Sequence, residues 1–317
     1  MKFAASLLAG AAATLIGTAA LAQEIPVKIA VLSDMSSLYS DIGGPGSIAA
    51  AKLAIADFDP AAHGLKVELV SADHQNKPDV GANIARQWYD VDHVDMIVDV
   101  PTSSVALAVS DVTREKNKVF LVSGAAISDL TGPKCSPNTI HWTYDTWMLA
   151  NGTGKSVVKT GGDTWFFLTA DYAFGHALER DTTAVVLANG GKVLGSVNVP
   201  LNNQDFSSFL LQAQASKAKI IGLANAGGDT DNAIKQGAEF GIVAGGQHFA
   251  AASEDDRRGI ALERMTESIV RGQKEPGVAA GLCQRAGGRM REHPGVIGPV
   301  DGVGRAFRAG EIGNRRA

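Results

Sequence analysis

The stretch Val27-Lys28-Ile29-Ala30-Val31-Leu32-Ser33 indicates the architecture of the chain, because its apolar run is interrupted only by Lys28. A short continuous apolar run is typical of a strand buried on both faces of a parallel sheet. A polar loop follows over residues 34–46, and the alanine-rich segment from Ser47 to Phe58 then favours a helix, which Pro60 ends. A strand followed by a helix is the first part of a β-α-β unit.

The same alternation continues along the chain. Further strands are predicted over residues 65–70, 94–100 and 119–123, and helices over residues 78–89 and 103–116. A second series has strands over residues 164–169, 192–199 and 219–225 and helices over residues 175–188, 205–215 and 229–240. Residues 133–162 are predicted as a crossover followed by one helix. The fold class is therefore α/β, with two Rossmann-like lobes, each a parallel sheet covered by helices, and a cleft between them.

The basic residues change type near Gln247. Residues 1–246 carry 14 Lys and 3 Arg, whereas residues 247–317 carry 1 Lys and 11 Arg. Regular alternation gives way at the same place to a Gly- and Arg-rich segment with little periodicity. The predicted domains are lobe 1 (23–141), a crossover with a partial lobe 2 (142–246) and a divergent, poorly ordered tail (247–317).

Residues 1–22 have the features of a secretory signal peptide. Lys2 gives a positive start, an apolar core follows, and Ala20-Leu21-Ala22 offers small residues for cleavage after Ala22. A membrane-anchoring helix is the alternative, although the run barely reaches spanning length. In an oxidising compartment Cys135 and Cys283 could form a disulfide, and an unpaired Cys135 is equally compatible with the sequence.

Composition and motifs argue against several classes of function. Residues 23–246 carry 16 Lys and Arg against 24 Asp and Glu, a net charge of −8, which argues against a nucleic-acid partner. The 7 His residues lack metal-ligand spacing, and no nucleophile-elbow or dinucleotide motif occurs. The segment Gly152-Thr153-Gly154-Lys155-Ser156 lacks the earlier glycine of a phosphate-binding loop and is interpreted as a solvated helix. No catalytic residue, metal or cofactor is predicted, which favours a binding protein over an enzyme.

Ligands of open parallel sheets bind beyond the carboxyl ends of the strands. In lobe 1 this position falls in three loops, at residues 34–46, 101–104 and 124–128. Thr102, Ser103 and Ser104 lie where a strand ends and a helix begins, so free N–H groups, the helix dipole and the hydroxyls could hold a carboxylate. Simple capping of the helix by one of these residues is the other interpretation.

Five segments in order carry a family resemblance. They are Val27-Lys28-Ile29-Ala30-Val31-Leu32-Ser33-Asp34, Thr102-Ser103-Ser104, Ser123-Gly124-Ala125-Ala126, Ala170-Asp171-Tyr172-Ala173-Phe174-Gly175 and Asp205-Phe206-Ser207. Through them residues 24–246 resemble the type I periplasmic substrate-binding proteins of ABC transporters, in the branched-chain amino acid-binding (leucine-binding) family. The resemblance implies two lobes that close on a small-molecule ligand, a periplasmic location and a membrane permease as partner. We also expect a monomer.

The resemblance also implies ligand-binding residues in lobe 1. Ser103 and Ser104 would hold a ligand carboxylate through hydroxyl and N–H groups, and Ala125 would offer its carbonyl oxygen to an ammonium group. The family often has threonine where this chain has Ile127, which can offer only its backbone N–H. This departure admits other acids and amides besides amino acids.

In lobe 2 the resemblance implies that Tyr172 or Phe174 closes over the ligand, and that Asn225 and Ala226 line the cleft. Ordinary packing at a strand end is the other interpretation of the two aromatic residues. The family clamp takes the acidic partner of an ammonium group from a strand that would follow Gly246. That strand is not recognisable in the sequence, nor are the segments that complete lobe 2 and return to lobe 1.

The leading prediction is the substrate-binding component of an ABC importer that captures a small carboxylate-bearing ligand, either a branched-chain amino acid or a related acid or amide. Three alternatives stay open: a non-functional remnant of such a protein, an enzyme on a doubly wound α/β fold, and a sensor domain. The change at Gln247 motivates the remnant, because a shifted reading frame would produce such a tail. Alternative frames without family-like strands downstream of Gln247 would contradict that hypothesis.

Overall fold

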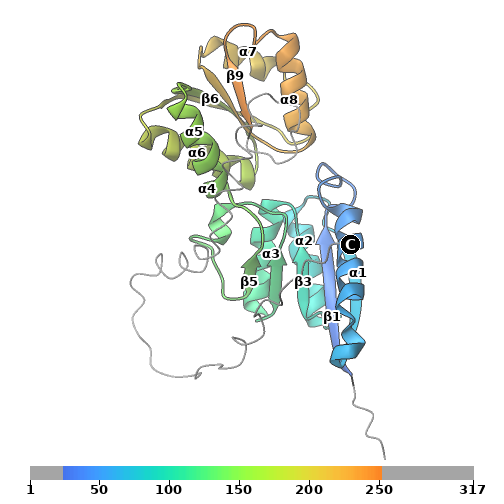
Figure 1. Ribbon diagram of the computed structural model, residues 1–317. Helices are drawn as coiled ribbons and strands as arrows, with labels where there is room; N and C mark the ends of the chain where they lie inside the picture. The colour runs from blue at the N-terminus through green and yellow to red at the C-terminus, as the bar shows by residue number, and fades with distance from the viewer. Residues whose placement is uncertain (1–23, 252–317) are drawn as a thin grey trace, which may run out of the picture.

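Two α/β lobes make up the part of the chain that the structure describes, residues 24–251 of a computed structural model. Figure 1 shows lobe 2 above lobe 1, with the chain passing between them after β5. Every strand pair in both sheets is parallel, which confirms the predicted fold class. The predicted signal peptide and most of the tail, including Cys283, lie outside the described residues.

Lobe 1 contains a five-stranded sheet in the order β2-β1-β3-β4-β5. Its strands are β1 (Ile25–Ser33), β2 (Leu65–Asp73), β3 (Met96–Asp99), β4 (Val119–Val122) and β5 (Thr139–His141). Its helices are α1 (Gly44–Phe58), α2 (Pro78–Asp90) and α3 (Ser103–Glu115), with short turns η1 (Pro60–His63) and η2 (Ser128–Leu130). The three-residue β5 was not predicted, because it is too short to show a pattern.

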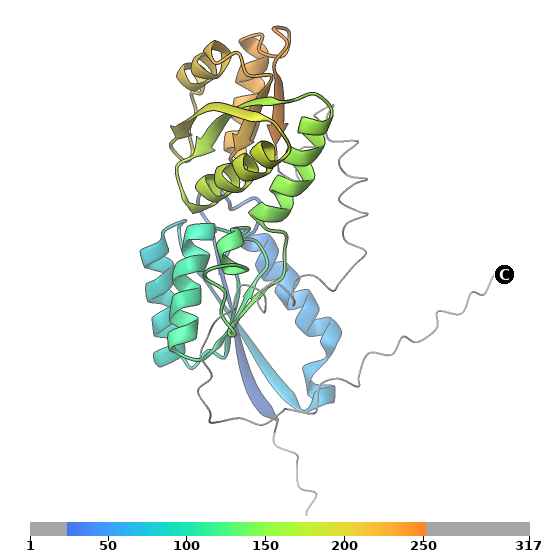
Figure 2. The ribbon, with the colours of Figure 1, turned by 90° about the vertical axis from the view of Figure 1, so that its left-hand side faces the viewer.

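The helices cover the two faces of the lobe 1 sheet unequally. Helices α2 and α3 pack together on one face, and α1 lies on the other (Figure 2). Trp88 and Tyr89 of α2 are part of the main core of lobe 1, whereas Gly44 is the one buried residue of α1. Leu53 of α1 is 65% exposed. Helix α1 therefore presents an apolar surface to solvent.

Lobe 2 contains a four-stranded sheet in the order β7-β6-β8-β9. Its strands are β6 (Thr164–Ala170), β7 (Lys192–Val199), β8 (Ile220–Ala224) and β9 (His248–Ala251). Its helical segments are α4 (Thr146–Leu149), the π-helical η3 (Ala150–Gly154), α5 (Lys155–Lys159), α6 (Ala173–Ala188), α7 (Ser207–Ala215) and α8 (Gly228–Glu239). The strands β6 and β8 at its centre are buried almost throughout, as their continuous apolar sequences predict.

Two details differ from the sequence-based expectations. A strand does follow Gly246, since β9 pairs with β8 from His248 to Ala251. Four residues are too few for a recognisable pattern, but the open edge of β8 supplies the hydrogen-bonding partners. The segment from Gly152 to Ser156 is helical as predicted, yet Thr153 and Gly154 are buried against α6 rather than solvated.

Hydrogen bonds and an ion pair join the lobes at one side. The carboxylate of Asp181 on α6 accepts hydrogen bonds from the hydroxyls of Ser128 at 2.7 Å and Thr146 at 2.6 Å. The guanidinium of Arg180 lies 3.0 Å from the Asp129 carboxylate. We call these five residues the interlobe polar cluster. Because Ser128 and Asp129 belong to lobe 1, the cluster fixes one edge of the interface.

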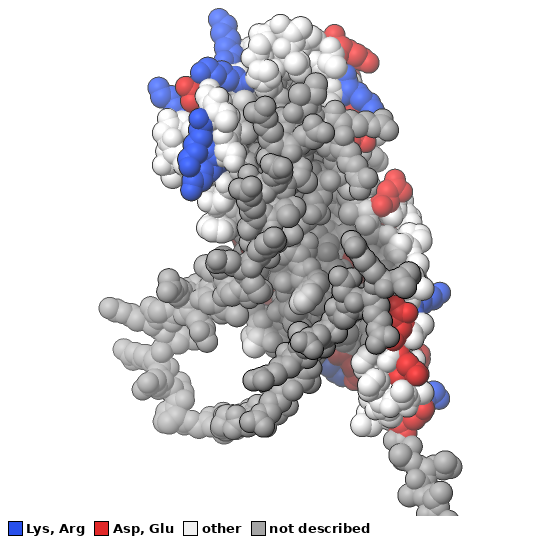
Figure 3. All heavy atoms as spheres, in the orientation of Figure 1, with Lys and Arg blue, Asp and Glu red and all other residues white. Residues whose placement is uncertain are grey.

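Neither lobe forms a strongly basic surface among the described residues. Residues 24–141 carry 9 Lys and Arg against 15 Asp and Glu, and residues 142–251 carry 7 against 9. In Figure 3 basic side chains gather at the upper end, on lobe 2, and acidic ones along the lower right edge, on lobe 1. Within residues 24–251 no helix is long and apolar enough to cross a membrane. Cys135 is a free thiol in this part of the chain.

Candidate functional site

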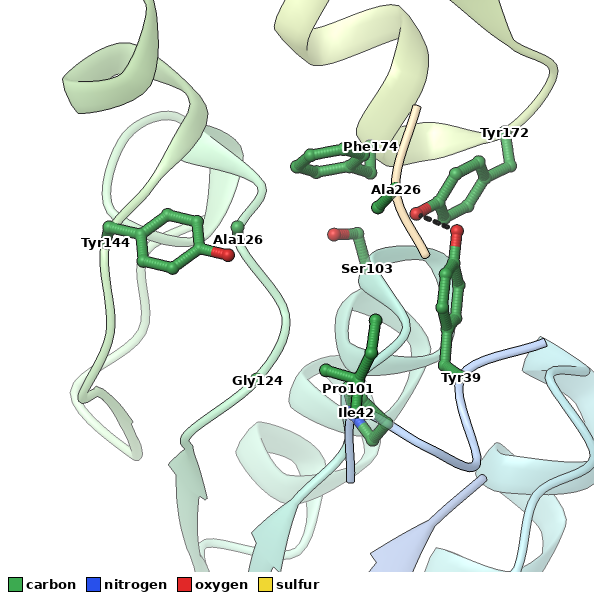
Figure 4. A pocket seen from close by; sticks show the side chains of 10 residues that line it. All are labelled: Tyr39, Ile42, Pro101, Ser103, Gly124, Ala126, Tyr144, Tyr172, Phe174 and Ala226. Carbon is green, nitrogen blue, oxygen red and sulfur yellow. Dashed lines mark hydrogen bonds between the residues drawn. The ribbon is translucent and has the colours of Figure 1, made fainter. Parts of the chain in front are cut away.

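A cavity of about 50 Å³ lies between the lobes, beyond the carboxyl ends of strands from both sheets. Its lining residues, drawn in Figure 4, are Tyr39, Ile42, Pro101, Ser103, Gly124, Ala126, Tyr144, Tyr172, Phe174 and Ala226. A volume of this size holds on the order of four water molecules. None of the lining residues within positions 24–251 is charged, so there a ligand would contact neutral donors and aromatic rings.

The N-terminus of α3 opens into this cavity. Thr102 precedes the helix but its side chain makes no capping hydrogen bond, and its buried hydroxyl has no partner among the described residues. Ser103 is 1% exposed; in Figure 4 its side chain lies below Phe174 and Ala226, and its hydroxyl points to the side of Ala126 and Tyr144. The first amides of a helix have no acceptor within the helix. The helix end therefore keeps its donors available for an anion, and Thr102 does not cap it.

A strained turn delivers Ser103 to the cavity. At the end of β3, Asp99 and Val100 have φ angles of 82° and 57°, which places two non-glycine residues in the left-handed region. For a β-branched residue this conformation is an outlier. The Val100 amide donates to the Leu32 carbonyl at 2.9 Å, and the Asp99 carboxylate accepts from the Ser123 hydroxyl at 3.0 Å. Strain of this kind persists where surrounding contacts enforce it, and it is concentrated at binding sites.

A buried carboxylate organises the loop that carries Tyr39 and Ile42. Asp34 is fully buried at the end of β1. Its oxygens accept hydrogen bonds from the amides of Ser37 and Tyr39, each at 2.9 Å, and from the Ser37 hydroxyl. These contacts fold the loop back over the sheet, which brings the Tyr39 ring to the cavity.

Two tyrosines from different lobes meet at the cavity wall. The Tyr39 hydroxyl donates a hydrogen bond to the Tyr172 hydroxyl at 2.6 Å (Figure 4). The Tyr172 ring also lies against Phe174, with centroids 6.0 Å apart. Burial raises the pKa of both tyrosine hydroxyls above their ordinary value, so both remain neutral.

A buried carboxylate lies near this pair of hydroxyls. Asp229, in the first turn of α8, accepts hydrogen bonds from the amides of Asn202 at 3.0 Å and Asn203 at 2.9 Å. Burial raises the pKa of Asp229, and its negative charge helps to raise the pKa of Tyr39 and Tyr172. Gly227 begins this segment with a φ of 62°, and a Cβ there would lie 3.6 Å from the Tyr39 ring.

The structure brings half of the predicted site residues together. Ser103, Tyr172, Phe174 and Ala226 line the cavity. The other four, Ser104, Ala125, Ile127 and Asn225, are outside the lining. Tyr172 and Phe174 pack in a hydrophobic cluster of lobe 2, and both also line the cavity.

The Ala125 carbonyl has a partner within lobe 1. It accepts a hydrogen bond from Nε2 of His141 at 2.7 Å, and burial lowers the pKa of this histidine. Ile127 belongs to the core of lobe 1, at 3% exposure. The side-chain oxygen of Asn225 accepts from the Thr230 hydroxyl at 2.7 Å. These residues support the cavity walls from behind.

Sequence reasoning missed the other six lining residues: Tyr39, Ile42, Pro101, Gly124, Ala126 and Tyr144. All but Tyr144 lie in the loops that were predicted to face a ligand. Nothing in the sequence distinguishes Tyr39 from its neighbours, because its position depends on hydrogen bonds to Asp34. Tyr144 belongs to the aromatic crossover, for which no role was predicted.

Two parallel-sheet lobes with a neutral cavity between them define a clamp-like binding protein. The family model described as periplasmic binding protein matches residues 26–268. The chain belongs to this periplasmic binding protein family. Membership favours the binding protein over the enzyme that the sequence left as an alternative.

Solved structures agree with this assignment. A periplasmic binding protein from Burkholderia mallei is 47% identical, with a TM-score of 0.70 over 80% of this chain and 73% of that one. A branched chain amino acid ABC transporter periplasmic ligand-binding protein from Burkholderia xenovorans LB400 is 39% identical, with a TM-score of 0.60 over 71% of this chain and 60% of that one. A solute binding protein of an ABC transporter from Rhodopseudomonas palustris HaA2, in complex with p-hydroxybenzoic acid, is 25% identical, with a TM-score of 0.62 over 71% and 61%.

Curated relatives match over a shorter range. The Leu/Ile/Val-binding protein homolog 6 of Brucella abortus (strain 2308) is 24% identical over 116 residues, which is 37% of this chain and 29% of the relative. The chain therefore matches less than a third of the length of this relative.

Proposed function

We propose that this chain is the substrate-binding component of an ABC importer, which captures a small carboxylate in the periplasm and presents it to a membrane permease. Family membership and the ABC transporter proteins among its structural relatives support this role. No reaction is involved. Contacts of the ligand with both lobes would stabilise the closed arrangement and so drive closure.

One observation carries the proposal: the uncapped N-terminus of α3 opens into the interlobe cavity beside Ser103. A carboxylate there would accept hydrogen bonds from the Ser103 hydroxyl and from the first amides of the helix, and the helix dipole would favour its charge. The part of the chain that the structure describes contributes no lysine or arginine to the cavity, so these neutral donors are the groups that would hold the anion.

The lining favours an aromatic acid over an amino acid. Four of its residues, Tyr39, Tyr144, Tyr172 and Phe174, present aromatic rings. Among the described residues no carboxylate lines the cavity, so an ammonium group would find no negatively charged partner there. The relative from Rhodopseudomonas palustris HaA2 binds p-hydroxybenzoic acid, which agrees with this ligand class.

Isothermal titration of the purified chain with benzoate, 4-hydroxybenzoate and leucine tests the proposal. Ser103→Ala should weaken binding of the aromatic acid by about tenfold, because a hydrogen bond to a charged group is lost. Ser104→Ala is the matched control, since this hydroxyl lies outside the lining. The Ser104 variant should bind like the wild type.

Other outcomes separate the alternatives. Binding of leucine without any aromatic acid would overturn the ligand class and leave the transport role in place. A folded chain that binds none of the three would favour the non-functional remnant. An unchanged affinity in Ser103→Ala would place the carboxylate elsewhere.

A further inference from the structure

The two cavity tyrosines occupy corresponding places in the two lobes. Tyr39 lies in the loop after β1, and Tyr172 lies directly after β6. Each of these strands has a neighbour on both sides within its sheet. Their hydroxyls meet across the interface at 2.6 Å. A ligand group that contacts this pair therefore contacts both lobes at once.

The hydrogen bonds of this pair leave one donor unused. Tyr39 donates to Tyr172, so the Tyr172 hydroxyl still has its own proton to donate. Tyr172 makes no second hydrogen bond with a residue that the structure describes. A buried hydroxyl without an acceptor costs free energy, which an oxygen atom of a ligand in the cavity would recover.

Charge decides what kind of oxygen fits there. Asp229 is 2% exposed, and its charge acts on both tyrosine hydroxyls. A second anion would be repelled from this end of the cavity. The ligand carboxylate therefore belongs at the N-terminus of α3, and the oxygen at the tyrosines is neutral.

We propose that Tyr39 and Tyr172 form a specificity site for a neutral oxygen at the far end of an aromatic acid. The chain then prefers a hydroxylated aromatic acid to an analogue of the same size without the hydroxyl. This inference rests on the proposed function, because it needs the carboxylate at Ser103. The ligand oxygen accepts a hydrogen bond from the Tyr172 hydroxyl and joins the contact that spans the lobes.

Calorimetric titration with 4-hydroxybenzoate and 4-methylbenzoate tests the proposal, because the methyl group matches the hydroxyl in size but cannot hydrogen-bond. The wild-type chain should bind 4-hydroxybenzoate about tenfold more tightly. In Tyr172→Phe this ratio should fall to about one, because the free donor is gone, while the affinity for 4-methylbenzoate changes by less than about threefold.

Two further variants make the result decisive. Tyr39→Phe keeps the Tyr172 hydroxyl but removes the hydroxyl that donates to it. The ratio of the affinities for 4-hydroxybenzoate and 4-methylbenzoate should therefore fall less than in Tyr172→Phe. Tyr89→Phe removes a buried hydroxyl that bonds to Thr113 inside lobe 1, away from the cavity, and should keep the wild-type ratio. This control separates a local effect from a general loss of stability, which circular dichroism would detect.

The outcomes distinguish this inference from the proposed function. Equal affinities for the two acids in the wild type, or an unchanged ratio in both Tyr172→Phe and Tyr39→Phe, would overturn the specificity site and leave the proposed function intact. Failure of the wild type to bind benzoate, 4-hydroxybenzoate or leucine would overturn both.

Discussion

At the scale of single residues, His74 lies beneath the loops that form the cavity. It is fully buried, and its Nδ1 accepts a hydrogen bond from the Asn76 amide at 3.0 Å. The carboxylates of Asp34, Asp73 and Asp99 favour its charged form, but burial outweighs them and lowers the pKa of His74. The folded chain therefore keeps this imidazole neutral.

This burial predicts a loss of stability in mild acid. Below about pH 6.5 the unfolded chain binds a proton that folded His74 excludes, so the free energy of unfolding falls by up to about 1.4 kcal/mol per pH unit. His74→Asn, whose Oδ1 can accept from Asn76, should reduce the slope of unfolding free energy between pH 7 and pH 5. Urea denaturation at several pH values measures it.

The comparison of variants isolates this histidine. His141, whose pKa burial also lowers, and Asp229, whose pKa burial raises, titrate in both chains and cancel from the difference. His63→Asn is the control, because it removes a histidine that is exposed in the folded chain. A His74→Asn chain with the wild-type slope would contradict the prediction.

Residue roles were predictable where the signal is local. Ser103 follows a strand, precedes a helix and carries a hydroxyl, and these three facts stand in the sequence. Tyr39 has no such signal, because Asp34 places it through hydrogen bonds across five residues. The hydrogen bond from His141 to the Ala125 carbonyl was not predictable, since the two residues are 16 positions apart.

At the scale of secondary structure, Gly175 sets how closely α6 approaches β6. A Cβ atom at this position would lie 2.0 Å from the Ala170 carbonyl oxygen. Real side chains do not come this close to backbone, so the helix would have to move. Tyr172 and Phe174 precede Gly175 on the same segment and would move with it.

We predict that Gly175→Ala lowers the free energy of unfolding by about 2 kcal/mol and weakens ligand binding, because overpacking shifts the start of α6. Gly152→Ala is the control, since nothing lies within 4 Å of its Cβ position. Alanine there should leave binding unchanged and stabilise the helical segment by up to about 1 kcal/mol. Equal effects of the two substitutions on binding would contradict this account.

The edge strands β2 and β7 were predictable, as were the strands in the middle of the sheets, whereas the edge strands β5 and β9 were not. The apolar sequences of β1, β6 and β8 reflect burial by helices and neighbouring strands. The strands β5 and β9 have three and four residues and lack the branched apolar run that marks the equally short β3 and β4. They form because β4 and β8 offer open hydrogen-bonding edges.

At the scale of the whole molecule, the interlobe polar cluster and the tyrosine pair hold the lobes together on different sides. In the cluster, Asp181 accepts from Ser128 and Thr146, and Arg180 pairs with Asp129. The tyrosines meet at the cavity and are available to a ligand. Closure about a fixed cluster would bring the cavity walls together around that ligand.

Asp181→Ala should loosen this arrangement. Loss of the shared acceptor should lower the free energy of unfolding by about 2 kcal/mol, increase the radius of gyration of the ligand-free chain and weaken ligand binding. Small-angle scattering and calorimetry measure these effects. Asp163→Ala is the control, because it breaks an exposed ion pair with Lys219 within lobe 2. It should leave the unfolding free energy, the radius of gyration and ligand binding unchanged. An Asp181→Ala chain with unchanged scattering would show that the cluster does not fix the lobes.

The two-lobe architecture was predictable because each lobe repeats the same strand-helix alternation. Contacts between the lobes were not, since they join residues such as Tyr39 and Tyr172 that are 133 positions apart. The apolar periodicity of a sequence indicates which face of a helix or strand packs against its own sheet. It does not indicate which residue lies opposite in the other lobe.

Each sheet is built from one uninterrupted stretch of the described chain, and the polypeptide crosses between the sheets once, after β5. A chain arranged in this way can complete its first sheet before the second has left the ribosome. Cleavage of this crossover by a protease would then leave two halves, each with its own hydrophobic core, joined only by the contacts between the lobes.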